Sequence, residues 1–216
     1  MKIGVLGTGT VGQTIAARLA EAGHQVGLGG RSAESDAAAG WAARTGNNAR
    51  TGTFHDIAAF GELVINCTLG TASLAALDMA GAQNLDGKVL LDVANPLVFG
   101  ADRSVTLSVC NDDSLAEQIQ RGYPAARVVK GLNTVSAQVM PHPEAIPGDH
   151  VLPICGNDAD AKVKVRGLLH DMGWPDGRII DLGDLAAARS TEAYFLFWFR
   201  LMSTLGTPRF NITVAR

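Results

Sequence analysis

The sequence predicts an α/β fold: a doubly wound, mostly parallel sheet followed by a long C-terminal apolar helix. Three observations predict it. Residues 1–32 have the pattern of a strand, a glycine turn, a helix and a second strand. Apolar runs of strand length then alternate with helical patterns through residue 182. The last helical pattern, residues 185–205, is heavily apolar.

The first turn follows a strand expected at Lys2 to Leu6, and it has the spacing G-x-G-x-x-G in Gly7, Gly9 and Gly12. Gly7 lets the chain turn sharply, Gly9 leaves room for a pyrophosphate on the helix N-terminus, and Gly12 lets the helix pack close to the strand. Such glycines alone are a weak signal. Because they lie between a strand and a helix that ends near Gly23, they predict a Rossmann-type dinucleotide site.

The end of the second strand indicates which dinucleotide binds. An NAD site usually has Asp or Glu there, which accepts hydrogen bonds from the ribose 2′-OH, whereas this chain has two glycines, Arg31 and Ser32. Arg31 can offer a charged planar fork to a 2′-phosphate, Ser32 a hydroxyl, and Thr8 or Thr10 a further donor. The pattern favours NADP(H) over NAD(H), with a solvated loop arginine as the alternative for Arg31.

The other elements follow from apolar periodicity and turn residues. We expect a single domain, with a Rossmann core of residues 1–183 and a C-terminal helix and tail of residues 184–216. Strands are expected at residues 25–28, 49–54, 62–68, 88–92, 126–129, 150–155 and 178–182, and helices at 33–45, 55–61, 69–81, 114–121, 134–140, 158–172 and 185–205.

Composition restricts the partners and the compartment. The net charge is −3 and Lys and Arg form no cluster, which argues against a nucleic-acid or anionic-membrane surface. Cys67, Cys110 and Cys155 have no metal-ligand spacing and are expected to be buried small hydrophobes in a reducing compartment. The first strand leaves no room for a signal peptide, and the apolar run at residues 193–199 is too short to span a membrane. We therefore expect a cytoplasmic protein with a small-molecule redox substrate and no metal.

Site residues are predicted from the sheet topology, because a ligand of a doubly wound sheet lies across the carboxyl ends of its strands. A simple turn is the alternative for Asn95 and Pro96, and a helix N-cap is the alternative for Thr134. The candidates for the cofactor site are Gly7, Thr8, Gly9, Thr10, Val11, Gly12, Arg31, Ser32, Thr68, Leu69, Gly70, Asn95 and Pro96, followed by the loop Gly131, Leu132, Asn133 and Thr134.

Several of these segments carry a family resemblance that covers nearly the whole chain. The segments are GTGTVGQTIAARLAEAGHQVGLGGRS at residues 7–32, ANPL at 94–97, VVKGLNTVSA at 128–137, CGND at 155–158 and DMGW at 171–174. Together they resemble the NADPH-dependent reductases related to coenzyme F-420:NADP oxidoreductase, a group to which the cytosolic domains of STEAP-type metalloreductases are also similar. The resemblance implies the fold and NADP(H) as cofactor, and it says little about the substrate.

The resemblance also implies roles for particular residues. A threonine at Thr8 or Thr10 and a Ser-Arg pair after the second strand would hold the 2′-phosphate. Here Gly30 precedes Arg31 and the serine follows it, which leaves Arg31 as the main phosphate ligand. The nicotinamide would lie near the loop of Asn133, Thr134, Val135 and Ser136, where a deazaflavin (coenzyme F-420) or a flavin stacks against it, and Gly131 and Asn133 would leave room for a planar ring.

Direct hydride transfer to a deazaflavin or flavin requires stacking and a short distance, and no acid–base residue. This suits a chain in which the sequence offers no convincing catalytic dyad. His142 and His150 are expected close to the crevice, and Lys130 is expected to be solvated or to face a phosphate.

Two alternatives for the function stay open: reduction of a small carbonyl or imine, and an NADPH-binding sensor without catalysis. The large helical domain that carbonyl and imine reductases normally add is not visible after the first ~160 residues. The long apolar helix from Leu185 is expected either to close over the acceptor site or to pair with a second subunit as a homodimer.

Overall fold

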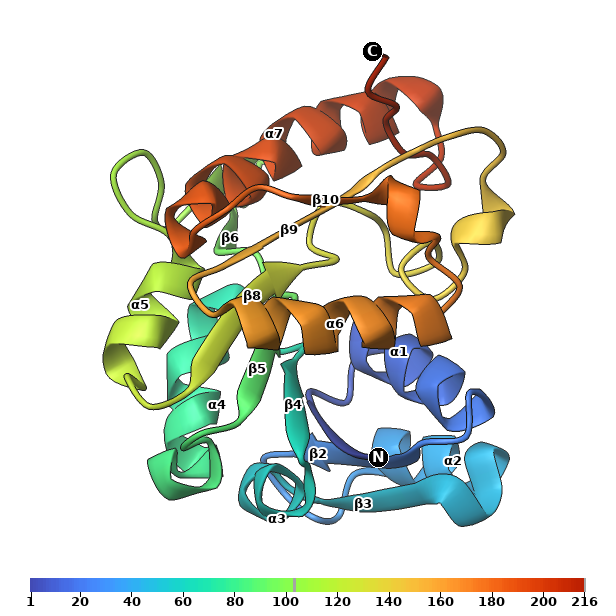
Figure 1. The fold of residues 1–216 in the computed structure, drawn as a ribbon, viewed down its shortest axis with the longest axis vertical. Coiled ribbons are helices and arrows are strands. Elements are labelled where there is room, and N and C mark those ends of the chain that lie inside the picture. The colour runs from blue at the N-terminus through green and yellow to red at the C-terminus, as the bar shows by residue number, and fades with distance from the viewer. Residues whose placement is uncertain (103, 216) are drawn as a thin grey trace.

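A computed structural model describes residues 1–102 and 104–215. Its main feature is an eight-stranded sheet in the order β10-β9-β8-β5-β4-β1-β2-β3, with helices on both faces (Figure 1). The strands are β1 (Lys2–Leu6), β2 (Gln25–Gly30), β3 (Ala49–Thr53), β4 (Leu63–Asn66), β5 (Val89–Asp92), β8 (Arg127–Gly131), β9 (Leu152–Gly156) and β10 (Ile179–Asp181). The helices are α1 (Thr10–Glu21), α2 (Asp36–Thr45), α3 (Phe54–Phe60), α4 (Ser73–Ala80), α5 (Leu115–Gly122), α6 (Ala159–Asp171) and α7 (Ala188–Leu205).

The strand pairing is that of a doubly wound sheet. Strands β3, β2, β1, β4, β5 and β8 pair in parallel, and the chain winds outward in both directions from β1, which pairs with both β2 and β4. Strand β9 pairs with β8 in antiparallel orientation and with β10 in parallel. The predicted mostly parallel, Rossmann-type sheet is confirmed, and it places a topological switch point beside the carboxyl end of β1.

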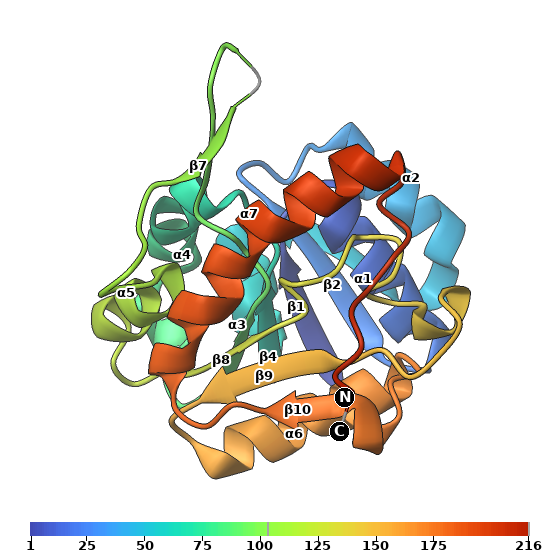
Figure 2. The same cartoon turned by 90° about the horizontal axis from the view of Figure 1, so that it is seen from above.

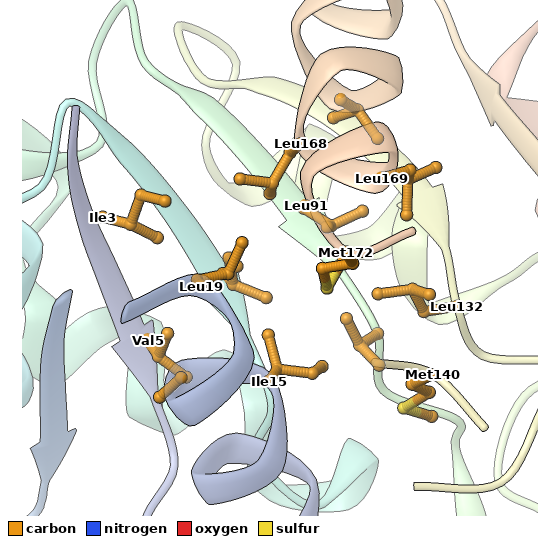
Figure 3. Packing of buried hydrophobic residues seen from close by; sticks show 14 of the residues in the cluster. Ile3, Val5, Ile15, Leu19, Leu91, Leu132, Met140, Leu168, Leu169 and Met172 are labelled. Atoms are coloured by element: carbon orange, nitrogen blue, oxygen red, sulfur yellow. The ribbon is translucent and has the colours of Figure 1, made fainter. Parts of the chain in front are cut away.

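Two hydrophobic cores hold the helices on the sheet. One joins α1, α2 and α6 to one face. Figure 3 shows Ile15 of α1 and Leu168 of α6 in this core, to which Trp41 of α2 also belongs. The other joins α3, α4 and α5 to the opposite face through residues such as Ile57 and Leu77. Because both faces are covered, the central strands β4 and β5 are buried along their whole length, and only their last residues, Asn66 and Asp92, are polar.

Helix α7 has a different position from the other helices. It crosses over the carboxyl ends of the strands, as the view from above shows (Figure 2). The tail after it returns to the sheet, where the amide of Val151 donates to the carbonyl of Ile212 over 3.0 Å. The helix thus covers the edge of the sheet at which the acceptor site is expected.

Four sequence predictions need correction. Strand β8 extends to Gly131, so Lys130 and Gly131 lie within the sheet and do not follow it. The helix predicted at residues 134–140 is wrong: these residues form turns. Pro141 lacks an amide hydrogen and disfavours helical geometry in the residue before it, which leaves too few residues for a stable helix. A hairpin of β6 (Leu97–Phe99) and β7 (Val105–Leu107) was not predicted, and Cys110 is exposed.

Candidate functional site

The turn between β1 and α1 is shaped by its glycines. Gly7 has a φ of +120°, and a Cβ there would lie 2.6 Å from the carbonyl oxygen of Cys67. A Cβ on Gly12 would collide with the carbonyl of Gly7, whereas a Cβ on Gly9 would meet no atom of the described residues within 4 Å. Gly9 therefore faces open space, and the other two glycines are needed for packing.

The N-terminus of α1 is open to a ligand. Gly9 is its N-cap, no side chain caps it, and its first turn contains no acidic residue. The free amide groups and the positive end of the helix dipole thus point toward the space that Gly9 leaves open. This arrangement suits a pyrophosphate.

A cavity of about 540 Å³, here called the glycine-loop cavity, lies beside this turn. Arg31, at the end of β2, is an exposed residue on its wall. Ser32 is not part of the wall, and its hydroxyl accepts a hydrogen bond from the amide of Glu34 over 3.1 Å. The cavity is lined by Gly7, Thr8, Gly9, Arg31, Phe54, Cys67, Thr68, Leu69, Ala72, Ala75, Ala76 and Met79.

A second cavity of about 260 Å³ lies beneath α7 and is called the α7 cavity. Its wall combines strand-end loops with Phe195 and Trp198 of α7. It shares Cys67, Thr68 and Leu69 with the glycine-loop cavity, so the two adjoin at the loop after β4. Its lining is Val11, Cys67, Thr68, Leu69, Gly70, Val93, Ala94, Asn95, Leu97, Asn133, Thr134, Val135, Ser136, Ala137, Met140, Phe195 and Trp198.

The loop after β4 is held by Asn66, a buried residue at the end of that strand. The side-chain oxygen of Asn66 accepts from the hydroxyl of Thr68 over 2.7 Å and from its amide over 3.3 Å. Gly70 packs so closely on the next loop that a Cβ would collide with the carbonyl of Asn95. The junction between the two cavities is therefore fixed by side-chain hydrogen bonds and by a close backbone contact.

The loops after β5 and β8 are joined by a reciprocal pair of amides. Asn95 Nδ2 donates to the carbonyl of Asn133 over 2.8 Å, and Asn133 Nδ2 donates to Asn95 Oδ1 over 3.0 Å. The preceding residue, Leu132, is buried with a φ of +63°, an unfavourable conformation for a branched residue. Such strain persists only where the surroundings enforce it, and here it turns the loop into the cavity.

The same loop contains buried polar atoms that have no hydrogen-bond partner among the described residues. They are Asn133 Oδ1, Thr134 Oγ1 and Ser136 Oγ. Across the cavity, Trp198 Nε1 is also buried without a partner among the described residues. Buried polar atoms nearly always have a partner, so these donors and acceptors are suited to a polar ligand such as a carboxamide. The N-cap alternative for Thr134 is wrong, because no helix begins there.

Next to the α7 cavity lies a buried charged cluster that the sequence prediction missed. Lys130, only 1% exposed, places Nζ 2.7 Å from Asp92 Oδ2 and 2.8 Å from Glu192 Oε1, and it also donates to the carbonyl of Ala94. Burial would lower the pKa of Lys130, but the two carboxylates outweigh burial and raise it, so the ammonium stays charged. The prediction of a solvated or phosphate-facing lysine is wrong. The sequence does contain one signal of a buried lysine, because Lys130 lies within the otherwise apolar run VVKG at residues 128–131.

Other predicted residues lie outside the two cavities. Thr10 lines a groove between α1 and α2, and Gly131 packs on Ile154 within the sheet. Pro96 is buried and lines neither cavity. His142 is exposed and pairs with Glu144, whereas His150 is buried against Trp174, so neither is a wall residue of the crevice.

The described residues contain no group of three or more His, Cys, Asp or Glu side chains that could hold a metal ion. Within the same part of the chain, no helix combines the length and the apolar character needed to cross a bilayer.

Comparisons with known proteins agree with this geometry. The family model for coenzyme F420-dependent NADP oxidoreductases matches residues 2–96. The solved structure of a candidate F420-dependent NADP-reductase from Arthrobacter sp. FB24 is 47% identical, with a TM-score of 0.94 over 100% of both chains.

Two further matches are more distant. Metalloreductase STEAP3 of Rattus norvegicus is 30% identical over 194 residues, which are 89% of this chain and 36% of that protein. A reductive aminase from Aspergillus terreus, solved with NADPH4, is 22% identical with a TM-score of 0.65, over 95% of this chain and 62% of that one, and this likeness shows the fold alone. The chain thus spans about a third of the metalloreductase.

The strand-end site, the family model and the full-length match to the Arthrobacter structure lead to one assignment. This chain belongs to the coenzyme F420-dependent NADP oxidoreductase family, and it is an NADP-dependent oxidoreductase.

Proposed function

We propose that NADPH lies across both cavities, with its adenosine half in the glycine-loop cavity and its nicotinamide in the α7 cavity. The open space at Gly9 and the uncapped N-terminus of α1 suit the pyrophosphate that joins the two halves. The unpartnered atoms of Thr134 and Ser136 suit the carboxamide of the nicotinamide. The cofactor-site residues that line neither cavity, Thr10, Gly12, Ser32 and Pro96, would act through the backbone or through packing.

We propose that Arg31 binds the 2′-phosphate. It is exposed on the wall of the glycine-loop cavity at the end of β2, where an NAD site would have a carboxylate. Thr8 lines the same cavity and is the second candidate donor, whereas Thr10 lies in the groove between α1 and α2. The positions of Arg31 and Thr8 support a preference for NADP(H) over NAD(H).

The reaction that we propose is hydride transfer between NADPH and a deazaflavin such as coenzyme F-420, with a free flavin as second choice. Bound NADPH would supply the hydride. The observation that carries the proposal is the character of the α7 cavity: among the described residues, its wall contains no ionisable side chain except Cys67, and burial raises the pKa of that thiol well above its usual range. A ring that accepts hydride by stacking needs no proton donor from this wall.

The protein's contribution would be to orient and to exclude water. Phe195 and Trp198 of α7 add aromatic side chains to the cavity wall, and Val11 and Met140 add apolar surface. Such a wall favours a flat ring at the reacting distance of ~3 to 3.5 Å and keeps water from the transferred hydride.

Reduction of a small carbonyl or imine is the second candidate. The hydroxyls of Thr134 and Ser136 favour it. When hydride adds to the carbon of a carbonyl or imine, a free hydroxyl can donate a hydrogen bond to the oxygen or nitrogen bonded to that carbon. Neither hydroxyl is a strong acid, however, so the proton that completes such a product would have to come from water. We therefore place this reaction second.

The loss of NADPH absorbance separates the two candidates. Purified protein is given coenzyme F-420, FMN, FAD, ferric complexes, a small ketone and a small imine in separate reactions. We expect rapid oxidation of NADPH with F-420 and slower oxidation with flavins. Turnover of the ketone or imine alone would support the second candidate and contradict the first.

We also propose a homodimer that forms through α7. Leu196 and Phe197 are 39% and 57% exposed on this helix, and Val98 and Phe99 of the β6–β7 hairpin are exposed as well. Light scattering of purified protein should give twice the chain mass, and Phe197→Glu should shift it to the monomer mass. A monomer at every protein concentration would contradict the proposal.

The proposed location is the cytoplasm, which the three free cysteines support. We further propose that residues 1–183 and the C-terminal segment 184–216 form one folding unit, so that a single cooperative unfolding transition is expected.

A further inference from the structure

Lys130 is bonded to three separate parts of the α7 cavity's surroundings. Its Nζ meets Asp92 at the end of β5, the carbonyl of Ala94 in the loop that lines the cavity, and Glu192 on α7. These partners accept all three hydrogens of the ammonium. Ala94 belongs to the floor of the cavity, and Glu192 precedes the wall residue Phe195 by one helical turn.

Glu192 extends these contacts to a further helix. Its Oε2 accepts from the amide of Leu115 over 2.9 Å, and its Oε1 accepts from the amide of Ala116 over 3.2 Å, in the first turn of α5. Every described partner of this carboxylate is a donor, which is the environment of an ionised group. One side chain of α7 is thus held by β8 and by the N-terminus of α5.

Asp92 continues the network to the junction of the two cavities. Its Oδ1 accepts from Asn66 Nδ2 over 2.8 Å, and the oxygen of Asn66 holds the hydroxyl of Thr68. All three charged residues and Asn66 are buried. A continuous set of hydrogen bonds therefore runs from α7 through β8, β5 and β4 to the Thr68 loop.

Stability alone does not account for such a network, because a buried ion pair is often no more stabilising than apolar residues of the same volume. Hydrogen bonds are directional, however, and apolar contacts are not. An apolar contact would hold α7 on the sheet but would allow the helix to slide. The contact between Lys130 and Glu192 instead fixes both the position of α7 along its axis and its rotation about that axis.

We propose that Asp92, Lys130 and Glu192 are positioning residues that fix the aromatic wall of α7 over the cavity floor, and so set the geometry of hydride transfer. This inference rests on the proposed function for the reaction itself. It assigns a role in positioning, and none in proton transfer, to the charged cluster.

The test compares Glu192→Gln with Glu117→Gln, a matched control. Glu117 also joins α5 to α7, through Arg189 at 2.6 and 2.9 Å, but at a partly exposed site outside the cavity. In Glu192→Gln the new NH₂ group meets a donor in either orientation, the amide of Leu115 in one and Lys130 in the other, so two donors oppose each other and we expect α7 to shift. The variant Asp92→Asn/Lys130→Met/Glu192→Met removes every charge of the cluster, so that the cost of an unpaired buried ion is avoided. It leaves the amides of Leu115 and Ala116 without their acceptor.

Two measurements are made on the whole protein. The first is the fluorescence energy transfer from Trp198 to bound NADPH. Each variant is compared with the same variant that also carries Trp198→Phe, and the difference between the two signals is the contribution of Trp198. This measurement needs no hydride acceptor. The second is the single-turnover rate with saturating NADPH and F-420. Glu192→Gln and the triple variant should reduce energy transfer and lower the rate at least about tenfold, with the NADPH Kd changed less than about twofold. Glu117→Gln should leave the energy transfer unchanged and the rate within about twofold of the unmodified protein.

Unchanged energy transfer in Glu192→Gln, or equal loss in both glutamate variants, would overturn the inference. If the unmodified protein transfers no hydride to F-420, the proposed acceptor is wrong, and the energy-transfer comparison still decides whether the cluster positions α7.

Discussion

The two cavities of this protein are built in different ways. The phosphate-binding side of the glycine-loop cavity depends on main-chain features that are close in sequence: the turn after β1, the amides of α1 and the end of β2. Apolar residues of α3, α4 and the loop after β4 complete its wall. The α7 cavity combines the loops after β4, β5 and β8 with a helix from the end of the chain, and side-chain contacts such as Asn95 to Asn133 hold it together. Nucleotide binding should therefore depend on backbone geometry, and hydride transfer on tertiary contacts.

The largest expected effect comes from Gly9→Val in the glycine-loop cavity. A branched side chain there would project into open space where the pyrophosphate is proposed to lie, so the Kd for both NADPH and NADH should rise at least about 100-fold. The thermal unfolding temperature should stay nearly constant. Fluorescence titration and a thermal melt measure the two quantities.

Gly12→Val is the control for this variant. Its Cβ would collide with the carbonyl of Gly7, so it should lower the unfolding temperature as well as binding. Normal NADPH binding by Gly9→Val would mean that the glycine has only a structural role.

Arg31→Ala should act on one nucleotide only. The unmodified protein should bind NADPH at least about tenfold more tightly than NADH, a difference of about 1.4 kcal/mol, because one charge-assisted phosphate contact supplies that much. The variant should lose most of this preference with nearly unchanged NADH binding. Equal affinities in the unmodified protein, measured by titration, would refute the role of Arg31.

Thr134→Val tests the α7 cavity by replacing an unpartnered buried hydroxyl with a methyl group of similar size. The free protein should become more stable by about 1 kcal/mol, because an unsatisfied polar group is removed. NADPH binding should weaken about fivefold, because a hydrogen bond to the carboxamide is lost. Calorimetry measures both, and a loss of stability together with unchanged binding would show that the hydroxyl does not serve the ligand.

The smallest effect is expected from thiol labelling. Cys110 is exposed, whereas burial raises the pKa of the Cys67 thiol at the junction of the cavities. Iodoacetamide at neutral pH should therefore label Cys110 alone and leave NADPH binding unchanged. Mass spectrometry identifies the labelled residue, and early labelling of Cys67 would show that the junction is open to solvent.

The sequence predicted most of what is local. The segment from Lys2 to Ser32 carries its own strand, turn and helix signals within a few residues, so the sequence alone predicts the Rossmann-type fold and the glycine turn of the glycine-loop cavity. The β6–β7 hairpin was missed although runs rich in Val and other apolar residues flank Gly100.

Contacts between distant residues could not be predicted in the same way. Lys130 was expected to be solvated because Glu192, its partner on α7, is remote in sequence and nothing in the pattern links them. The turn at residues 134–140 has a helical composition, but Pro141 ends it on one side and the positive φ of Leu132 precedes it on the other, which leaves too short a segment for a helix. The topology predicts strand-end residues of the α7 cavity such as Asn95 and Thr134, whereas the residues that α7 contributes, Phe195, Trp198 and Glu192, are recognised only once the chain is folded.

The most direct test of the proposed reaction follows a hydrogen isotope. NADPH deuterated stereospecifically at nicotinamide C4 is mixed with the protein and coenzyme F-420 in a stopped-flow instrument, and the product is analysed by mass spectrometry. Deuterium in the reduced deazaflavin, together with a slower transfer for one of the two C4 stereoisomers, is the expected result. Absence of the label from deazaflavin and from flavin, with deuterium found in a reduced ketone or imine, would contradict the assignment.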